Sequence, residues 1–281
     1  MVNYKFKQIK LCNKRSIKTR ANILKILVSN DDGIDSAGIA ALQKSLSEIA
    51  EVTVVAPRLE QSAVGHGITM QIPLRVTEYY KNGNFFGYAV DGTPADCIKM
   101  GIRNILKESP DLVVSGINNG SNTAINIIYS GTVSAAIEAA IMDVPSIAVS
   151  VTSHNVKHYE YAAEVAKMLV LKVKEKGLPL GTLLNVNVPD LPEDKIEGIL
   201  ITKQGKSKWD DIYEKRTDPY GRDYYWLVGE MTNADTNLDV DQVAIKKNFV
   251  SVTPIHFDLT DYETFNSLKK WNIERKKNAD S

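Results

Sequence analysis

The chain has few of the residues that build thiolate metal sites, disulfide frameworks or histidine triads. Its 281 residues include two cysteines and four histidines. Cys12 and Cys97 stand in dissimilar surroundings, without a CxxC spacing or a histidine at metal-ligand spacing, which argues against a zinc centre and against a disulfide framework. The histidines have no evident triad partners in the sequence. This cysteine usage is typical of a reducing cytoplasm.

Two further absences bear on partners and location. Lysine plus arginine and aspartate plus glutamate number 34 each, so no net charge draws the chain to nucleic acid or to an anionic membrane. No apolar run approaches the roughly 20 residues of a membrane span, and the N-terminus lacks a hydrophobic signal core. We therefore expect a soluble, cytoplasmic protein with neither a nucleic-acid nor a membrane partner.

Several motifs of nucleotide-binding proteins and hydrolases are also missing. The sequence contains no GxxxxGK[ST] loop, no GxGxxG after a strand and no GxSxG elbow, which argues against the two usual nucleotide-cofactor loops and against a serine hydrolase. Covalent aspartyl catalysis needs Asp-x-Asp at the end of the first strand, whereas Asp31 is followed two positions later by Gly33. Any catalytic or ligand-binding site of this chain must therefore be built from residues other than these motifs.

Strands alternate with helices from Ile23 onward. Strands are predicted at 24–29, 52–56, 111–115 and 146–151, and helices at 36–49, 94–107 and 132–142. This alternation predicts an α/β fold with a mostly parallel sheet flanked by helices on both faces. A hairpin is predicted over 74–90, turning at Asn82-Gly83. The hydrophobic content of 43% is enough for one domain with a substantial core.

The two ends of the chain differ from this pattern. Residues 1–22 are rich in lysine and arginine and contain no acidic residue, which predicts a flexible basic extension. An unused upstream start and a targeting segment are the alternatives. We expect a single domain over 23–265 and a tail over 266–281. After residue 181 this domain has predicted strands at 182–188, 198–202 and 249–254 and a terminal helix at 260–271.

One segment of that domain, about 207–230, resembles an arm rather than core. Its tyrosine and tryptophan side chains stand among many charges. Aromatic residues in such a setting are common at subunit interfaces, so we predict a C-terminal β-hairpin arm that serves oligomerisation. A hairpin folded back on its own domain is an equal alternative.

Polar residues follow three predicted strands where each one ends. The loops are Asp31-Asp32-Gly33, then Arg58-Leu-Glu-Gln-Ser62, then Gly116-Ile-Asn118-Asn119-Gly120-Ser-Asn122. Ligands of open parallel sheets collect at the carboxyl ends of the strands. Carboxylate, hydroxyl and amide oxygens there suit magnesium, manganese or calcium. The alternatives are a helix cap for one aspartate and turn-forming roles for Ser62, Asn118 and Asn122.

A turn of small residues, Ser130-Gly131-Thr132, leads into the predicted helix at 132–142. The N-terminus of a helix presents free backbone N–H groups and the positive end of the helix dipole, which suit a phosphate group. An ordinary helix cap is the alternative, because serine, glycine and threonine are common at that position. Next to a metal site the turn becomes a candidate phosphate clamp.

Taken together, these residues resemble the stationary-phase survival protein (SurE) family of metal-dependent 5'-nucleotidases. The resemblance covers about residues 23 to 265. It rests on six ordered motifs, which are Ser29-Asn-Asp-Asp-Gly33, Ala56-Pro-Arg-Leu-Glu-Gln-Ser62, Asp91-Gly-Thr-Pro-Ala-Asp-Cys97, Ser115-Gly-Ile-Asn-Asn-Gly-Ser-Asn122, Tyr129-Ser-Gly-Thr132 and Ser251-Val-Thr-Pro254. It implies a Rossmann-like phosphatase domain whose arm is exchanged between the subunits of a homodimer or homotetramer.

The resemblance also implies the site. One divalent cation per subunit, Mg²⁺ or Mn²⁺, would be held by Asp31, Asp32, Ser62 and Asn118. Asn122 and the turn Ser130-Gly131-Thr132 would surround the phosphate of a nucleoside 5'-monophosphate. Members often hydrolyse 3'-monophosphates as well, and some shorten polyphosphate.

For the reaction itself we expect a metal-activated water to attack the phosphorus directly. Asp31 or Asp32 would accept the proton of that water, and Asn122 would stabilise the charge that develops on the phosphoryl oxygens. The alternatives are a phosphatase for another small phosphomonoester and a non-catalytic sensor of metal and nucleotide.

Overall fold

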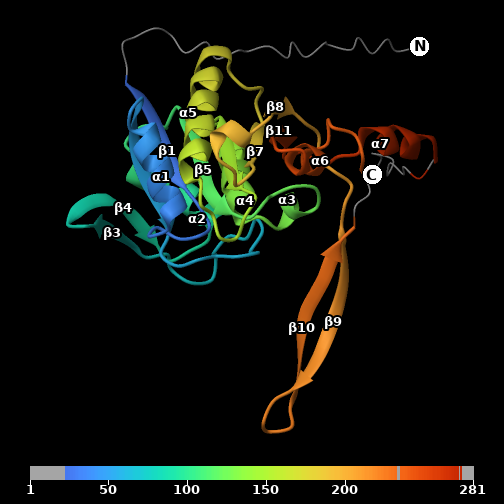
Figure 1. Ribbon diagram of the computed structural model, residues 1–281. Coiled ribbons are helices and arrows are strands. Elements are labelled where there is room, and N and C mark those ends of the chain that lie inside the picture. Colours follow the sequence, from blue (N-terminus) through green and yellow to red (C-terminus); the bar gives the residue numbers. More distant parts are fainter. Residues whose placement is uncertain (1–22, 233–234, 272, 274–281) are drawn as a thin grey trace, which may run out of the picture.

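The computed structural model describes residues 23–232, 235–271 and 273. The predictions for residues 1–22 and for most of the tail lie outside these residues. In the described part of the chain, nine strands form one sheet in the order β3-β4-β2-β1-β5-β6-β7-β11-β8 (Figure 1). Their bounds are β1 Leu24–Ser29, β2 Ala50–Pro57, β3 Val76–Lys81, β4 Asn84–Val90, β5 Leu112–Asn119, β6 Ser146–Val151, β7 Thr182–Val188, β8 Gly198–Ile201 and β11 Phe249–His256.

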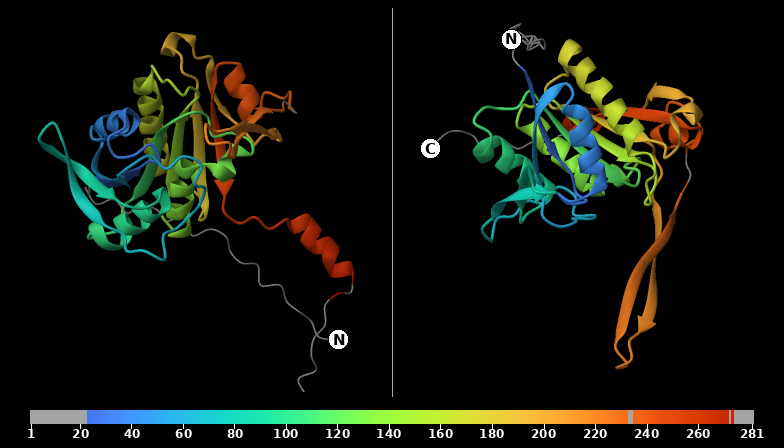
Figure 2. Two further views of the ribbon diagram at one scale, coloured as in Figure 1. Left: turned by 90° about the horizontal axis from the view of Figure 1, so that it is seen from below. Right: turned by 60° about the vertical axis from the view of Figure 1, so that its left-hand side comes forward.

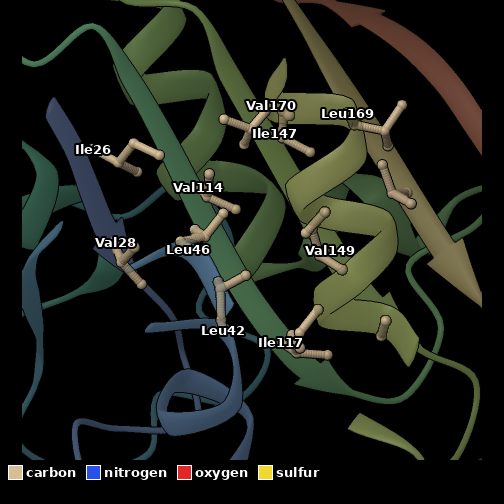
Figure 3. Close-up of a cluster of buried hydrophobic side chains, with 14 of the residues drawn as sticks. Ile26, Val28, Leu42, Leu46, Val114, Ile117, Ile147, Val149, Leu169 and Val170 are labelled. Atoms are coloured by element: carbon tan, nitrogen blue, oxygen red, sulfur yellow. The ribbon is translucent and has the colours of Figure 1, made fainter. Parts of the chain in front are cut away.

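Helices cover both faces of this sheet. The α-helices are α1 Ala37–Leu46, α2 Pro94–Met100, α3 Asn126–Tyr129, α4 Gly131–Ile141, α5 Tyr159–Lys176, α6 Asp241–Lys246 and α7 Tyr262–Leu268. On one face, Leu42 of α1 and Val170 of α5 belong to the same buried cluster as Val114 of β5 (Figure 3). On the other face, α2 and α4 bury Ile98 and Ala139 against β1 and β5. The result is a three-layer α/β/α sandwich.

The centre of the sheet brings three strand ends together. Strand β1 lies between β2 and β5 and runs parallel to both, with Val28 opposite Val54 and Ser29 opposite Ser115. β1, β5 and the second half of β2 consist largely of buried residues, as expected for a parallel sheet covered on both faces. The loops that follow β1, β2 and β5 therefore meet at one edge.

The predicted fold class is confirmed. The predicted strand bounds 24–29, 146–151 and 182–188 match β1, β6 and β7. The hairpin of β3 and β4 turns at Asn82 and Gly83, both with positive φ, as its Asn-Gly sequence predicts. The prediction of one α-helix over 94–107 was wrong in its second half, because the chain continues as a π-helix over Gly101–Ile105. Helix α5 was not predicted, although its apolar residues recur at helical spacing.

The predicted arm is present as a separate antiparallel hairpin. Strands β9 (Trp209–Thr217) and β10 (Asp223–Met231) pair with each other along their whole length and extend away from the body (Figure 1 and the right-hand view of Figure 2). Almost all of their residues are exposed. At its base, Trp209 Nε1 donates a hydrogen bond to Asn126 Oδ1 of α3 at 2.7 Å. Helix α7 also stands off the body (Figure 2, left). No described helix is long and apolar enough to cross a membrane.

Gly38 in the first turn of α1 offers a test of how closely this helix approaches the sheet. A Cβ at this position would lie 2.1 Å from the carbonyl oxygen of Ile117 in β5. Alanine is the better helix former by about 1 kcal/mol, yet we expect Gly38→Ala to lower the free energy of unfolding by about 1–3 kcal/mol. Urea denaturation measures this change. The reverse change at the exposed Ala37, Ala37→Gly, should cost at most about 1 kcal/mol. A stabilised Gly38→Ala variant would contradict the packing described.

Candidate active site

Asp31 and Asp32 stand directly after β1, at the edge where β2 and β5 also end. The side chain of Asp31 is buried, and that of Asp32 is half-buried. Both the hydroxyl and the backbone N–H of Thr132 donate hydrogen bonds to the Asp31 carboxylate. Helix α4 therefore directs its N-terminus, the positive end of its dipole, toward Asp31. This contact places an ionisable carboxylate against the turn that was predicted to bind phosphate.

Neither aspartate caps the following helix. Ser36 caps α1 instead, because its hydroxyl accepts a hydrogen bond from the N–H of Ile39. Asn30 supports that turn by donating to the hydroxyl of Ser36 at 2.8 Å and to the carbonyl oxygen of Gly33 at 2.9 Å. The capping alternative for Asp31 and Asp32 is therefore wrong, and both carboxylates need another explanation.

Burial dominates the electrostatics of the pair. It raises the pKa of Asp31, against the hydrogen bonds from Thr132. For Asp32, burial and then the charge of Asp31 raise the pKa to about 7, while a hydrogen bond from the N–H of Asn119 opposes them. The Oδ2 atom of Asp32 is buried and has no hydrogen-bond partner. An unpartnered carboxylate oxygen beside a second carboxylate is the arrangement that a bound cation stabilises.

The other two predicted ligands lie on the neighbouring loops. Asn118 is half-buried at the end of β5, and its Nδ2 donates to the carbonyl oxygen of Gly120 at 2.7 Å, which leaves its Oδ1 available. The loop after β2 reaches the site through Gln61, whose N–H donates to the carbonyl oxygen of Asp31 at 2.8 Å. The next residue, Ser62, is exposed and turns its hydroxyl to the carboxylate of Glu60.

This donor set fits a hard divalent cation. Among the described residues there is no cluster of three or more histidine, cysteine, aspartate or glutamate side chains that could hold a metal. A cation at the Asp31 and Asp32 pair would thus be completed by neutral oxygens, such as that of Asn118, and by water. Magnesium and manganese favour such oxygen sites and retain water ligands. Glu60, which the sequence reading did not single out, adds negative charge that raises the pKa of both aspartates.

The predicted phosphate turn is a well-formed helix start. The Ser130 hydroxyl accepts from the N–H of Val133 at 3.0 Å, and the Ser130 carbonyl accepts from the N–H of Ser134 at 3.1 Å. Ser130 is therefore the cap of α4. A Cβ at Gly131 would lie 2.8 Å from the Cβ of Asp31, so only glycine lets the helix come this close. The N–H groups of Thr132 and Val133 already have acceptors, so the turn offers fewer free donors than the sequence suggests.

Asn122 is held beside β6 and β7 by hydrogen bonds within the chain. Its Nδ2 donates to the hydroxyl of Ser150 on β6 at 2.8 Å. Its backbone carbonyl accepts from Asn185 and Asn187 of β7, at 2.7 and 3.1 Å. These contacts hold Asn122 in the sheet edge, buried beside β6 and β7. None of its described hydrogen bonds joins it to Asp31 or to Thr132.

A buried ion-pair group near the site was missed. Glu138 of α4 is 3% exposed; its Oε2 lies 2.8 Å from His66 Nε2, and Lys99 of α2 donates to its Oε1. Burial alone would raise the pKa of Glu138, but the hydrogen bonds from His66 and Lys99 outweigh it and hold the pKa below its usual value. The group ties the loop that carries Ser62 to α4. His66 and Glu138 lie 72 residues apart in sequence, so no local sequence pattern predicted their contact.

Comparison with known proteins agrees with these features. The family profile described as Survival protein SurE matches residues 26–211. Proteins named 5'-nucleotidase SurE from Chlorobium phaeobacteroides and Syntrophobacter fumaroxidans are each 48% identical over 250 residues; the match covers 89% of this chain and 97% and 100% of theirs. The crystal structure of the Sure protein from Aquifex aeolicus superposes with a TM-score of 0.77 at 43% identity, over 88% of this chain and 99% of that one.

The carboxylate pair makes a prediction about stability with and without metal. At pH 8, above its pKa of about 7, Asp32 is ionised in the metal-free fold, although burial and the neighbouring Asp31 both disfavour its charged form. Asp32→Asn should therefore raise the melting temperature of the metal-free protein, by about 2 °C or more. Manganese at about 100 times its Kd should stabilise the wild type by about 2.7 kcal/mol but should add little to the variant.

Thermal melts with chelator and with manganese measure both effects. The matched control is Asp35→Asn, in the same loop, because the exposed Asp35 bonds to Tyr79 and Lys81 rather than to the pair. This control should keep the full response to manganese. A loss of metal-free stability in Asp32→Asn together with an unchanged manganese response would contradict the assignment.

Proposed function

The chain belongs to the SurE family, and we propose that it is a metal-dependent 5'-nucleotidase, which hydrolyses nucleoside 5'-monophosphates to nucleoside and phosphate. The observation that carries this proposal is the buried pair of Asp31 and Asp32, with an unpartnered oxygen on Asp32, against the N-terminus of α4. The reaction is the one for which the relatives are named, 5'-nucleotidase. The site supplies oxygen ligands for a cation and a helix terminus for an anion.

In this proposal Asp31, Asp32, Ser62 and Asn118 hold one Mg²⁺ or Mn²⁺ ion per subunit. A bound cation of this kind polarises a phosphoryl oxygen and lowers the pKa of a bound water. Ser62 would turn its hydroxyl from Glu60 to the site to serve as a ligand, a rotation that its exposed position permits. Thr132 keeps Asp31 in place through the two hydrogen bonds that it donates.

Proton transfer and stabilisation of the phosphoryl charge are assigned to residues of the chain around the phosphoryl group. Asp31 or Asp32 accepts the proton of the attacking water as a general base. Ser130, Gly131 and Thr132 place the positive end of α4 against the phosphoryl oxygens, where it stabilises the developing charge. The role predicted for Asn122 requires its Nδ2 to exchange the hydroxyl of Ser150 for a phosphoryl oxygen.

The proposed assembly is a homodimer or homotetramer built through the arm. Support comes from the exposed apolar and aromatic side chains of β9 and β10, among them Tyr213, Trp226 and Leu227, which are 68%, 56% and 57% exposed. A hairpin with both faces open to solvent gains stability when a second subunit covers it. The cytoplasmic location stays a prediction.

Phosphate release tests the proposed reaction. The substrates are nucleoside 5'- and 3'-monophosphates, sugar phosphates and short polyphosphate, each assayed with magnesium, with manganese and with chelator. We expect release that is fastest from a nucleoside monophosphate and that chelator abolishes. Asp31→Asn should abolish turnover and leave the fold intact, as circular dichroism will show.

Two results would contradict this proposal. A fully active Asp31→Asn variant would remove the carboxylate pair from the reaction. Stoichiometric binding of a nucleoside monophosphate to metal-saturated protein, with no release of phosphate, would indicate the sensor instead. Faster release from a sugar phosphate than from any nucleotide would assign a different phosphomonoester as the substrate.

A further inference from the structure

A cavity of about 300 Å³ opens beside the site, at the ends of β2 and β4. Its lining comes from two parts of the loop between β2 and β3, and from the end of β4 with the residues that follow it. The lining residues are Arg58, Leu59, Gln61, Thr69, Val90, Asp91, Gly92 and Thr93. The volume lies at the lower end of the roughly 300 to 1,000 Å³ of small-molecule pockets. It admits one compact organic group.

The cavity and the candidate metal site share a wall. Gln61 lines the cavity and donates its N–H to the carbonyl oxygen of Asp31 at 2.8 Å. On the same segment, Leu59 and Glu60 pack against Gly33, where a Cβ would lie 3.3 Å from their backbone atoms. Only the segment from Leu59 to Gln61 therefore separates the cavity from the Asp31 and Asp32 edge. A group attached to a phosphate at that edge lies next to the cavity.

The walls are fixed by hydrogen bonds, so the cavity is built into the fold. The Thr93 hydroxyl donates to the carbonyl oxygen of Gly67 at 2.7 Å, and the N–H of Thr69 donates to the carboxylate of Asp96 at 3.0 Å. Across the opening, Arg58 Nε lies 2.5 Å from Asp91 Oδ1, and Arg58 Nη2 donates to Thr77 at 2.9 Å. These contacts join the loop after β2 to the start of α2 and to β3.

The chemistry of the lining selects the occupant. Among the described residues that line it, Arg58 and Asp91 are the only charged ones, and they pair with each other, so this lining carries no net charge. A second phosphate group would find no unpaired cation there. Thr69 and Gln61 bring hydroxyl and amide groups, whereas the exposed Leu59 brings apolar surface. Ribose hydroxyls and the flat apolar faces of a nucleobase match this mixture, and a bare sugar would leave the apolar part uncovered.

We infer that this cavity binds the nucleoside part of the substrate, its ribose and base, while the phosphate lies at the Asp31 and Asp32 edge. The inference rests on the proposed function and deepens it, because it names the residues that distinguish a nucleotide from other phosphomonoesters. Specificity then comes from uncharged hydrogen-bonding groups and apolar contact beside the site rather than from the metal ligands.

The test separates binding of the nucleoside from binding of the phosphate. Adenosine, D-ribose and inorganic phosphate are titrated separately into the manganese-loaded full chain by calorimetry. In Thr69→Trp a large side chain fills the cavity, and adenosine should bind about tenfold more weakly or worse, with the affinity for phosphate unchanged within about twofold. Ribose should bind the wild type more weakly than adenosine does.

Two further variants provide a matched control and a second test of the cavity. Met70→Trp adds the same side chain at the next position, which is 82% exposed and does not line the cavity, and it should bind both ligands as the wild type does. Leu59→Ser removes apolar surface from a residue that is 71% exposed, so the fold tolerates it; adenosine binding should weaken while phosphate binding holds. If Thr69→Trp fails to fold, the binding of adenosine and phosphate to Leu59→Ser tests the inference alone.

The outcomes distinguish this inference from the proposed function. No adenosine binding to the wild type, equal binding of ribose and adenosine, or equal weakening of adenosine and phosphate by Thr69→Trp would each overturn the nucleoside cavity. Where turnover is measurable, Thr69→Trp should raise KM for adenosine 5'-monophosphate and leave kcat nearly constant. Weakened adenosine binding in an enzyme that releases no phosphate would overturn the proposed reaction and leave the cavity assignment standing.

Discussion

The architecture around the site depends on two adjacent carboxylates held out of water at the end of a central strand. Burial of Asp31 and Asp32 costs free energy, since desolvation and mutual repulsion both favour their protonated forms. The fold offsets part of this cost with the hydrogen bonds that Thr132 and Asn119 donate. The buried Oδ2 of Asp32 still has no partner. In the proposed function a divalent cation supplies the missing partner, which explains why a fold would keep such a pair.

Helix α4 links this pair to the loops around it. Its first residues face Asp31, and about two turns further on Glu138 binds His66 and Lys99. The loop with Ser62 is thereby joined to the helix that approaches the carboxylates, and Asp96 holds the same loop from α2 through the N–H of Thr69. The proposed metal ligands, the start of α4 and the neighbouring cavity thus form one connected unit.

Much of the fold and part of the site could be read from the sequence, for local reasons. Apolar strands that end in polar loops predicted the sheet and placed Asp31, Asp32 and Asn118 at one edge, because parallel strands align their carboxyl ends. Contacts between distant segments could not be predicted in this way. The pairing of His66 with Glu138, the bond from Thr132 to Asp31 and the orientation of Asn122 toward Ser150 depend on packing that no short pattern encodes. The composition of the arm predicted a hairpin. Its outward direction depends on tertiary structure and could not be predicted from composition.

Crystals grown with manganese give the most direct test of the central claim, through the anomalous signal of the metal. We expect one manganese ion per chain, bound to carboxylate oxygens of the Asp31 and Asp32 pair, to the hydroxyl of Ser62 and to the amide oxygen of Asn118, with water completing its ligands. An ion bound elsewhere on the chain, or an empty pair whose Asp32 Oδ2 is satisfied by a side chain instead, would contradict it.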